Sequence, residues 1–407
     1  QSSSAASDVY KRQAFTDPTD PADRPAIPYP LPDPDGATGV TGKPVKVYIM
    51  SGQSNMVGYG RVDGGGAGTL ETFSKNEGKF PNLVDGSNNY LPRNDVWYEG
   101  VVTAAAKKWL EPGCGADGNK LGPELGFGQI MGWHHDEPVL LIKASQGNRG
   151  IGWDILPPGS TQYDWGNGNT YPGYGESPQS WNTATGSEAP AGWYAGKQYD
   201  DFFLDESAMG ARDWTIGVEY PANCQVTHNG WTYISTIANT ASVVNEPQVD
   251  GGGDPVASAE WGVYSIDNVS DVLDNFDTRF PAWAAQGFEI AGYAWFQGHW
   301  DQSEPYASRY EQNLVQLIDE TRDYFENRYP GKVVPSAPFA VATIGFGGVP
   351  YAPGTPSEKV HSAQLAVGDP VQHPQYAGNV NSVDTLPYWR DVADSPGSQG
   401  FHYNNNA

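Results

Sequence analysis

The stretch of sequence that decides the fold runs from residue 46 to residue 58 and reads KVYIMSGQSNMVG. Its first five residues, 46–50, are rich in β-branched, aromatic and apolar side chains and predict a buried strand. The residues that follow, 51–58, are mostly small or polar and predict a turn directly after that strand. Since ligands bind beyond the carboxyl ends of the strands in open α/β sheets, this turn is the first candidate for a binding site.

Strand and helix signals alternate on the C-terminal side of this stretch. The predicted strands cover residues 46–50, 139–142, 288–296, 339–344 and 380–383, and the predicted helices begin near residue 122 and cover residues 309–327 and 360–367. The strands are short apolar runs, and the helix at 309–327 carries apolar residues at helical spacing. This alternation predicts an α/β fold built from βαβ units.

Two segments fall outside the alternation. Residues 1–43 are rich in Ser, Asp and Pro and predict an extended N-terminal arm. Residues from about 157 to 285 are dominated by Trp, Tyr, Gly, Asn and Pro and predict a long insertion of loops and short strands. We therefore expect an arm over 1–43 and one α/β domain over 44–407 that carries this aromatic-rich insertion.

Composition excludes several classes of partner. The chain has 407 residues with 23 Lys and Arg against 48 Asp and Glu, which gives a net charge of −25. Long-range repulsion would oppose encounter with nucleic acid or with an anionic membrane surface. No apolar run is long enough to span a bilayer, and 38% hydrophobic residues are enough for a sizeable core. We expect a globular protein with neither nucleic acid nor membrane as partner.

The polar surface also bears on localisation. An acidic, Lys-poor surface and the acceptor sequon Asn268-Val269-Ser270 are compatible with a secreted protein, which is our expectation. Cys114 and Cys224 permit one disulfide but do not demand it. The oligomeric state is left open by the sequence.

Two motifs that suggest a cofactor are rejected. Residues 134–137 read HHDE, but adjacent residues on a turn cannot easily face one metal ion. Residues 39–43 read GVTGK, but they precede the strand, and Pro44 stands where a phosphate-binding loop needs Ser or Thr. We expect no metal and no cofactor.

Small polar motifs follow three of the predicted strands, at residues 52–56, 143–148 and 297–299. The carboxyl ends of parallel strands share one edge of a sheet, so these motifs can converge there. A serine hydroxyl such as that of Ser54 is a weak nucleophile without a base, and His402 can supply the base if the C-terminus returns to this edge. The backbone N–H groups of Ser54 and Gly147 and the side-chain amide of Gln297 can then stabilise an oxyanion.

In this order the motifs resemble those of the SGNH/GDSL-type hydrolases, specifically the branch of sialate O-acetylesterases and acetyl xylan esterases. The resemblance covers about residues 44–156 and 286–407 and leaves the insertion unmatched. It implies a flavodoxin-like three-layer α/β/α sandwich without a metal. It also implies Ser54 as nucleophile, His402 as base, and Ser54, Gly147 and Gln297 as the oxyanion hole.

The sequence departs from the family pattern at three positions, where Asn148, His299 and Gln399 replace the usual Gly, Glu and Asp. Gln399 stands where the family has the acid that orients the catalytic histidine, so either another carboxylate or a backbone carbonyl orients His402. The candidate acids are Asp384, Asp394 and Asp301. The candidate substrate-binding residues are Gln53, Asn148 and His299, of which His299 is equally well explained as a structural histidine or a second base.

Three functions follow from these features. The first is a carbohydrate O-acetylesterase that acts on an acetylated oligo- or polysaccharide. The second is a non-catalytic descendant that uses the fold and its aromatic insertion to bind glycans or to build an extracellular assembly. The third is an esterase or lipase for non-sugar esters, which requires a broad apolar pocket for the acyl group. The 14 Trp and 23 Tyr residues either fill the core or form a platform for sugar rings.

Overall fold

The computed structural model describes residues 27–28, 31, 36–64, 66, 68–189 and 192–389. His402, Asp394 and most of the predicted arm therefore lie outside the described residues. The chain divides into two compact units, which we call unit 1 and unit 2. Unit 1 comprises Gln1–Asn148, Asn275–His299 and Phe325–Ala407, and unit 2 comprises Arg149–Asp274 and Trp300–Tyr324.

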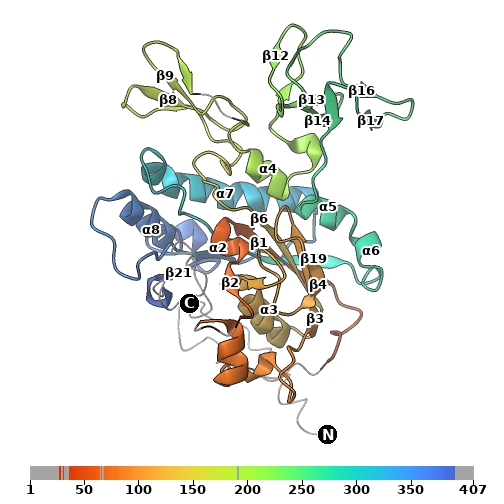
Figure 1. Ribbon diagram of the computed structural model, residues 1–407, viewed down its shortest axis with the longest axis vertical. Coiled ribbons are helices and arrows are strands. Elements are labelled where there is room, and N and C mark those ends of the chain that lie inside the picture. The colour runs from red at the N-terminus through yellow and green to blue at the C-terminus, as the bar shows by residue number, and fades with distance from the viewer. Residues whose placement is uncertain are drawn as a thin grey trace. The chain divides into compact units, whose positions relative to one another are not determined.

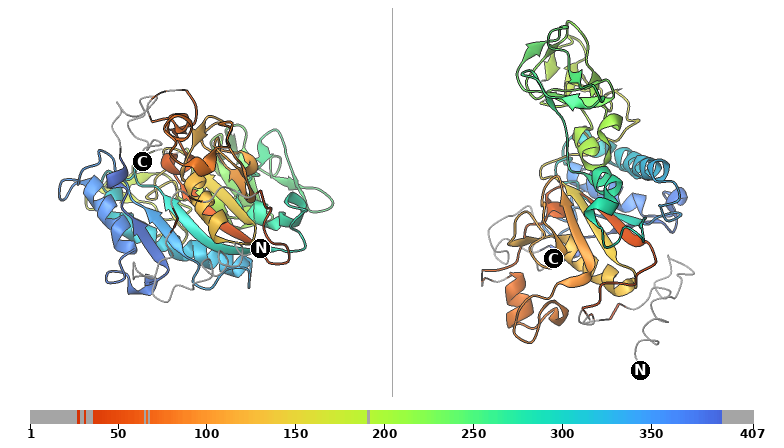
Figure 2. Two further views of the ribbon diagram at one scale, coloured as in Figure 1. Left: turned by 90° about the horizontal axis from the view of Figure 1, so that it is seen from below. Right: turned by 90° about the vertical axis from the view of Figure 1, so that its right-hand side faces the viewer.

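A seven-stranded sheet forms the centre of unit 1, in the order β21-β20-β19-β1-β6-β3-β4. Its strands are β1 (Val45–Gly52), β3 (Arg93–Val101), β4 (Lys107–Leu110), β6 (Val139–Ser145), β19 (Phe288–Phe296), β20 (Phe339–Ala342) and β21 (Val380–Val383). All neighbouring strands are parallel except β3 and β4. The sheet twists as its strands run side by side (Figures 1 and 2). The α/β prediction with a mostly parallel sheet is confirmed.

The five predicted strands lie side by side in the order β6-β1-β19-β20-β21, so the first strand of the chain lies between the second and the third. This is the flavodoxin-like lateral order that the resemblance implied. Strands β3 and β4, which the sequence did not predict, extend the sheet beyond β6. The chain enters unit 2 after β6 and returns to pair β19 with the opposite edge of β1. The switch point of the sheet therefore lies between β1 and β19.

Helices of unit 1 cover the sheet through apolar contacts. Helix α3 (Pro123–His134) begins with a proline in its first turn and packs on β3 and β6. Helix α8 (Pro356–Val367) is capped by Thr355, which accepts a hydrogen bond from Glu358 N (3.3 Å), and packs on β21. None of the helices in the described ranges is long and apolar enough to cross a bilayer.

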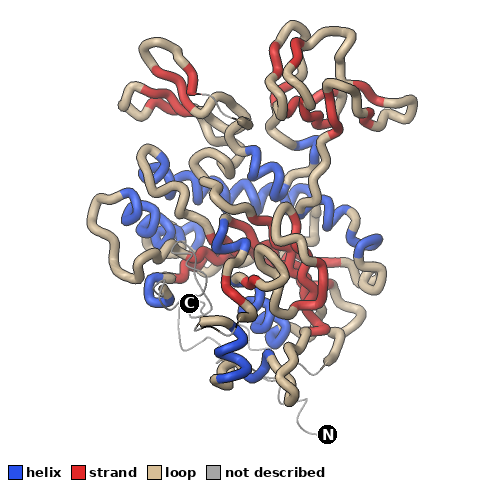
Figure 3. The backbone as a smooth tube through the Cα atoms, in the orientation of Figure 1, coloured by secondary structure: helices blue, strands red, loops and turns tan. Residues whose placement is uncertain are grey.

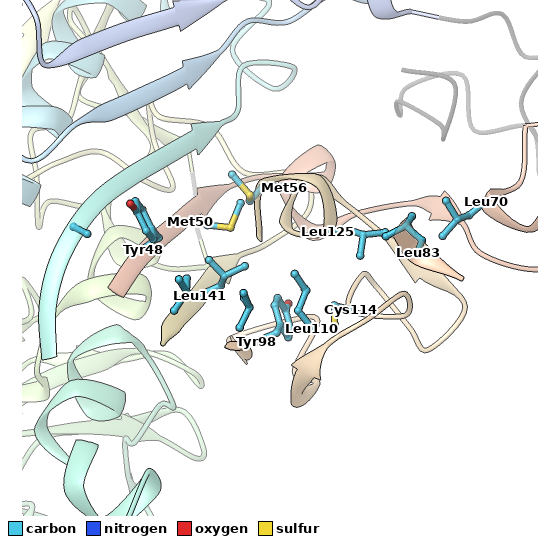
Figure 4. Close-up of a cluster of buried hydrophobic side chains, with 13 residues drawn as sticks. Tyr48, Met50, Met56, Leu70, Leu83, Tyr98, Leu110, Cys114, Leu125 and Leu141 are labelled. Atoms are coloured by element: carbon cyan, nitrogen blue, oxygen red, sulfur yellow. The ribbon is translucent and has the colours of Figure 1, made fainter. Parts of the chain in front are cut away.

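One buried cluster joins the sheet of unit 1 to the segments that follow β1 (Figure 4). Met50 on β1 and Met56 on the short helix α2 (Ser54–Val57) lie close together in it. Leu125 of α3 and Leu141 of β6 belong to the same cluster. Burial of each such side chain contributes about 1.5–3 kcal/mol, so the cluster fixes α2 and α3 against the strands.

The remaining elements of unit 1 are short. They are β2 (Gly60–Arg61), β5 (Lys120–Leu121), α6 (Phe276–Arg279), a π-helical turn (Thr72–Asn76) and 3₁₀ turns at Pro81–Leu83, Pro374–Tyr376 and Leu386–Tyr388. Helix α7 (Tyr306–Arg328) begins in unit 2 and ends in unit 1, and it confirms the helix predicted over residues 309–327.

Unit 2 consists mostly of loops joined by short strands (Figure 3). One sheet has the order β10-β9-β8-β7 and another the order β11-β13-β14-β18. Their strands are β7 (Tyr163–Asp164), β8 (Asn169–Tyr171), β9 (Ser180–Asn182), β10 (Glu188–Ala189), β11 (Arg212–Asp213), β13 (Gln225–His228), β14 (Trp231–Ser235) and β18 (Trp261–Val263). The other elements are α4 (Lys197–Phe203), α5 (Val269–Asp274), a 3₁₀ turn (Glu206–Ala208), and the strand pairs β12 (Glu219–Tyr220) with β15 (Asn239–Thr240) and β16 (Gln248–Val249) with β17 (Pro255–Val256).

The sequon at Asn268 serves the fold of unit 2. Asn268 is buried, its Nδ2 donates to Leu204 O (2.7 Å), and its Oδ1 accepts from Asp271 N (3.0 Å). Ser270 of the same sequon donates to Phe203 O (2.5 Å). An amide held in this way caps α5, so the sequon does not support secretion.

A fully buried carboxyl group, that of Asp200 on α4, ties several loops of unit 2 together. It accepts hydrogen bonds from the hydroxyls of Tyr174 (2.5 Å) and Tyr194 (2.7 Å) and from Gly210 N (2.8 Å). Burial raises the pKa of Asp200 to about 7, although these hydrogen bonds act to lower it.

This pKa predicts how the stability of unit 2 depends on pH. An aspartate in an unfolded chain has a pKa of about 3.9, so between about pH 4 and pH 7 the unfolded state releases a proton that the folded state keeps. We expect the thermal unfolding midpoint to fall as the pH rises through this window, and Asp200→Asn to flatten the profile.

The matched control is Asp250→Asn, because that carboxylate is exposed and its pKa is lowered by hydrogen bonds from the backbone of Asp254 and Gly252. This variant should keep the slope of the wild type. Calorimetry at successive pH values makes the comparison, and identical profiles for the wild type and Asp200→Asn would contradict the assignment to Asp200.

Candidate active site

Three neighbouring strands of unit 1 end at the same place and carry the three motifs expected to converge. Strands β19, β1 and β6 are adjacent, with Gly52 of β1 paired to Phe296 on one side and to Ser145 on the other. The segments after these residues hold Ser54, Gly147 and Gln297. The structure therefore brings the predicted nucleophile and the predicted oxyanion donors to one edge of the sheet.

Gly52 allows β1 and β19 to approach closely at this edge. Its φ is 150°, and a Cβ on it would lie only 2.2 Å from the carbonyl oxygen of Phe296. Because no side chain fits there, residue 52 has to be glycine. The close approach lets Gln53 N donate to Phe296 O (3.1 Å), which fixes the first residue of the turn.

The side chains of Gln53 and Gln297 join the turn to the neighbouring strand end. Gln53 Oε1 accepts from Gln297 Nε2 (3.0 Å) and from Gly298 N (3.2 Å). Both glutamines are buried, and Gln364 Nε2 donates to Gln297 O (2.5 Å). Gln53, a predicted substrate-binding residue, thus uses its side-chain oxygen to orient the Gln297 amide.

Ser54 begins the single turn of α2, which is closed by hydrogen bonds from Val57 N to Gln53 O (2.9 Å) and from Gly58 N to Ser54 O (3.0 Å). Its side chain is half-buried and accessible. A Cβ added to Gly147 would meet Ser54 Cβ at 3.9 Å, with nothing else within 4 Å. Gly147 and Ser54 therefore face each other, while Asn148 is exposed with a positive φ of 57°.

A buried ion pair is hydrogen-bonded to the end of α2. Lys143 on β6 and Glu124 on α3 are both fully buried, with Lys143 Nζ 2.7 Å from Glu124 Oε2. The ammonium group also donates to Val57 O (2.9 Å), the last carbonyl of α2, and to Cys114 O (3.0 Å). Glu124 Oε1 accepts from Gly122 N (2.8 Å). The pair thereby connects the turn that bears Ser54 to α3 and β6. The local sequence around Lys143 and Glu124 does not predict that they connect these elements.

The candidate base and acids are distributed differently. His402 and Asp394 lie outside the described residues. Asp301 belongs to unit 2, where its carboxylate accepts hydrogen bonds from Ile151 N (3.1 Å) and Gly152 N (2.8 Å). Both oxygens of Asp301 thus hold a loop of unit 2.

Asp384 follows β21, three strands away from β1, which is roughly 14 Å along the sheet edge. His361 of α8 lies beside it, with Nε2 3.1 Å from Asp384 Oδ1. Burial acts to raise the pKa of Asp384, but hydrogen bonds from Leu386 N and His361 outweigh it and the pKa falls below its ordinary value. Asp384 is therefore an ionised partner of His361.

His299 lies one residue beyond Gly298 and packs edge-to-face on Phe346, with ring centroids 4.9 Å apart. Phe346 in turn contacts Trp389 (5.6 Å). Burial lowers the pKa of His299, so its imidazole is neutral at pH 7. A neutral imidazole is competent as a general base.

A cavity of about 510 Å³ opens in unit 1 next to α2. Asn55, which follows Ser54, and Phe296, which precedes Gln297, both line it. Most of its other walls are apolar, including Tyr59, Leu70, Phe80, Leu83, Leu121 and Leu125. An esterase for non-sugar esters requires a broad apolar pocket of this kind for its acyl group, and the sequence alone does not show where such a pocket lies.

The His134–Glu137 segment contributes to structure. His135 Nε2 lies 2.7 Å from the hydroxyl of Tyr48, and burial lowers the pKa of His135 to about 4. Within the described ranges, no group of three or more His, Cys, Asp or Glu side chains is placed to hold a metal ion. Cys114 in unit 1 and Cys224 in unit 2 are both free thiols.

Comparison with known proteins gives distant similarities only. No protein-family model matches the chain, and no curated protein does. Similar solved structures include a protein from Arabidopsis thaliana, with 13% identity, a TM-score of 0.42, and coverage of 89% of this chain and 92% of that one. A carbohydrate acetylesterase from Xanthomonas citri has 10% identity and a TM-score of 0.39, and the match covers 89% of this chain and 53%, about half, of that one. NanS has 11% identity and a TM-score of 0.36, with 89% and 92% covered.

The buried ion pair predicts a specific pattern of stability. Lys143→Met leaves the Glu124 carboxylate buried without its partner, which should destabilise the fold by about 3–5 kcal/mol. The double variant Lys143→Met/Glu124→Gln removes both charges and should recover part of that loss. Urea denaturation of the single and double variants measures the coupling.

The control for this cycle is Lys46→Met. Lys46 on β1 pairs with Glu289 (2.5 Å) where both side chains are partly exposed, so its removal should cost only about 0–1 kcal/mol. Equal losses of unfolding free energy in Lys46→Met and Lys143→Met would contradict the prediction that the buried pair of Lys143 and Glu124 matters more to stability than the partly exposed one.

Proposed function

We propose that this chain is a serine carboxylic-ester hydrolase that removes acetyl groups from a glycan. The observation that carries the proposal is the placement of Ser54 on a tight turn, opposite Gly147 and directly after Gln53, whose side chain orients the amide of Gln297. A nucleophile and hydrogen-bond donors at one accessible point are what acyl transfer requires.

In the proposed reaction, Ser54 Oγ attacks the ester carbonyl carbon while the base removes the hydroxyl proton. The N–H groups of Ser54 and Gly147 and the Gln297 side-chain amide donate to the oxyanion that forms. The base then gives the proton to the sugar oxygen as its bond to the carbonyl carbon breaks, so the sugar leaves as an alcohol and an acetyl-serine remains. Water, activated by the same base, attacks this intermediate, and acetate and Ser54 are released.

The base in this proposal is His402, assigned through the resemblance of the sequence to the SGNH/GDSL-type hydrolases. A dyad of Ser54 and His402 does not require a carboxylate, since oxyanion stabilisation supplies much of the acceleration in such enzymes. The glycan as substrate is supported by the same resemblance and by the many aromatic side chains of unit 2. Secretion remains a proposal that follows from such a substrate.

The apolar cavity favours a second candidate, an esterase for substrates with a larger acyl group. Its lining begins at Asn55 and Phe296, each next to a proposed site residue. p-Nitrophenyl esters from acetate to octanoate separate the two candidates. Preference for the acetate ester supports the acetylesterase, and preference for the octanoate ester supports the second candidate.

The nucleophile is tested with Ser54→Ala. We expect this variant to lose about a thousandfold or more of kcat on p-nitrophenyl acetate and acetylated xylan, because no other residue takes over the attack. Released acetate and nitrophenol are the readouts.

Ser145→Ala is the matched control for this experiment. Ser145 stands at the neighbouring strand end, but its hydroxyl is fully buried and out of reach of a substrate. It should retain activity close to that of the wild type. Near-background rates for both the wild type and Ser54→Ala would reject the esterase and leave the non-catalytic, glycan-binding alternative.

The base is tested by comparing His402→Ala with His299→Ala. We expect His402→Ala to reduce kcat strongly and His299→Ala to leave most of it. If His299 is the base instead, His299→Ala loses most of kcat and His402→Ala keeps it. Because burial lowers the pKa of His299, kcat/KM of the wild type should then stay high down to a pH below the ordinary histidine pKa of 6.5. The pH–rate profile of each variant decides between them.

A further inference from the structure

Unit 2 contains a cavity of its own, with a volume of about 350 Å³. Its walls come from both small sheets of this unit, with Trp181 on β9, Arg212 on β11 and Gln225 at the start of β13. Trp193, Tyr194 and Glu176 also line it. The size is that of a small-ligand site, and none of the proposed catalytic residues contributes to it.

Two of the aromatic side chains of this cavity, those of Trp193 and Tyr194, are held in place by hydrogen bonds. Trp193 Nε1 donates to Asp154 Oδ1 (3.1 Å), and the hydroxyl of Tyr194 donates to Asp200 Oδ2 (2.7 Å). Trp181 is half-buried. Rings fixed in this way present apolar surface to a ligand at little further cost in conformational entropy.

The side-chain oxygen of Gln225 is a polar atom without a partner. Gln225 is 4% exposed, and its Oε1 has no hydrogen-bond partner among the described residues. The hydroxyl of Tyr264, which donates to Asp201 (2.5 Å) and accepts from Lys197 Nζ (2.9 Å), lies beside the amide and has a second lone pair for Nε2, so Oε1 is the atom left over. A buried amide oxygen of a cavity-lining residue, left over in this way, is the kind of group that a polar ligand satisfies.

The charges around the cavity balance each other. Arg212 is held by a hydrogen bond from Nη2 to Cys224 Sγ (3.2 Å) and lies over the ring of Tyr220. Glu176 supplies the opposite charge, and its Oε2 accepts from Gly173 N (2.8 Å). A polyanionic ligand would also meet the net charge of −25 of the chain, which opposes its approach. The cavity therefore suits a neutral ligand.

A neutral saccharide matches all of these features. The C–H faces of a sugar ring pack on flat aromatic rings, and its hydroxyls both donate to and accept from an amide. From this match we propose that the cavity of unit 2 binds a neutral saccharide unit, at a site separate from the ester-hydrolysing site of unit 1. The inference does not rest on the proposed function, because the cavity shares no residue with that site.

The test uses the full chain carrying Ser54→Ala, so that binding is measured without turnover. Xylotetraose, cellotetraose, mannotetraose and trigalacturonate are each titrated by calorimetry and by tryptophan fluorescence. We expect saturable binding of at least one neutral tetrasaccharide and none of trigalacturonate. Saturable binding of trigalacturonate alone, or of none of the four, would overturn the proposal.

Two variants locate the binding. Trp181→Ala should weaken it by at least about tenfold, whereas Trp165→Ala, a half-buried tryptophan of unit 2 outside the cavity lining, should leave it unchanged. Gln225→Leu should also weaken binding, yet keep or raise the unfolding midpoint, because it removes a buried amide whose oxygen is unsatisfied. Unchanged affinity in both Trp181→Ala and Gln225→Leu would overturn the proposal. Esterase activity of the wild type is measured separately, so failure of either proposal is recognised by itself.

Discussion

The contact between Gly52 and the backbone of Phe296 is the constraint on which the candidate site depends. Because residue 52 has no side chain, the end of β1 lies directly against the end of β19, and the turn after β1 is bonded to the neighbouring strand from its first residue. The side chain of Gln53 then reaches Gln297 and Gly298, and Ser54 begins its helical turn from a fixed point. Any larger residue at position 52 would separate the nucleophile from the amide proposed to stabilise the oxyanion.

The same turn is also bonded to a buried ion pair, that of Lys143 and Glu124. Taking Lys143 and Glu124 out of water costs free energy, which their mutual attraction offsets only when the remaining donors are also satisfied. Here Lys143 meets that condition through Val57 O and Cys114 O, and Glu124 through Gly122 N. An apolar pair of equal volume would fill the space but would not bond to the last carbonyl of α2. We interpret the pair as a device that fixes the position of one short helix.

The sequence predicted those parts of the fold that depend on local pattern. The strands 288–296 and 380–383 have the predicted bounds, because both are short β-rich runs between turn signals. β3 escaped prediction because charged residues interrupt its pattern. Glu99 is buried there against Arg279 (3.0 Å), 180 positions away in the chain, and against Lys107 (3.1 Å) of the neighbouring strand. The lateral order β6-β1-β19-β20-β21 of the predicted strands agrees with the flavodoxin-like order that the resemblance implied, whereas the addition of β3 and β4 beyond β6 has no local signal in the sequence.

The candidate site shows the same division. Ser54, Gly147 and Gln297 were found because small polar residues after apolar strands have a recognisable signature, and the sheet brings them together. Lys143 begins one of these motifs, but the sequence assigns it no role, because a lysine at the end of a strand ordinarily reaches solvent. Only the packing of α3 shows that Lys143 does not. The cavity of unit 2 depends on two sheets whose strands are two to five residues long, too short for a periodicity to be detected.

The two units are connected at the candidate site by the path of the chain. The chain leaves unit 1 for unit 2 twice, directly after Asn148 and directly after His299, and each exit follows a segment that carries a proposed oxyanion donor. Insertions at the carboxyl edge of an α/β sheet lengthen the loops that surround its ligand and leave its core strands unchanged. A chain that extends these two loops into a unit with its own polar and aromatic cavity can change what it binds without altering Gly52, Gln53 or Lys143. In the proposed function the chemistry resides in the strand ends of unit 1, and in the further proposal the choice of ligand can be modified in unit 2.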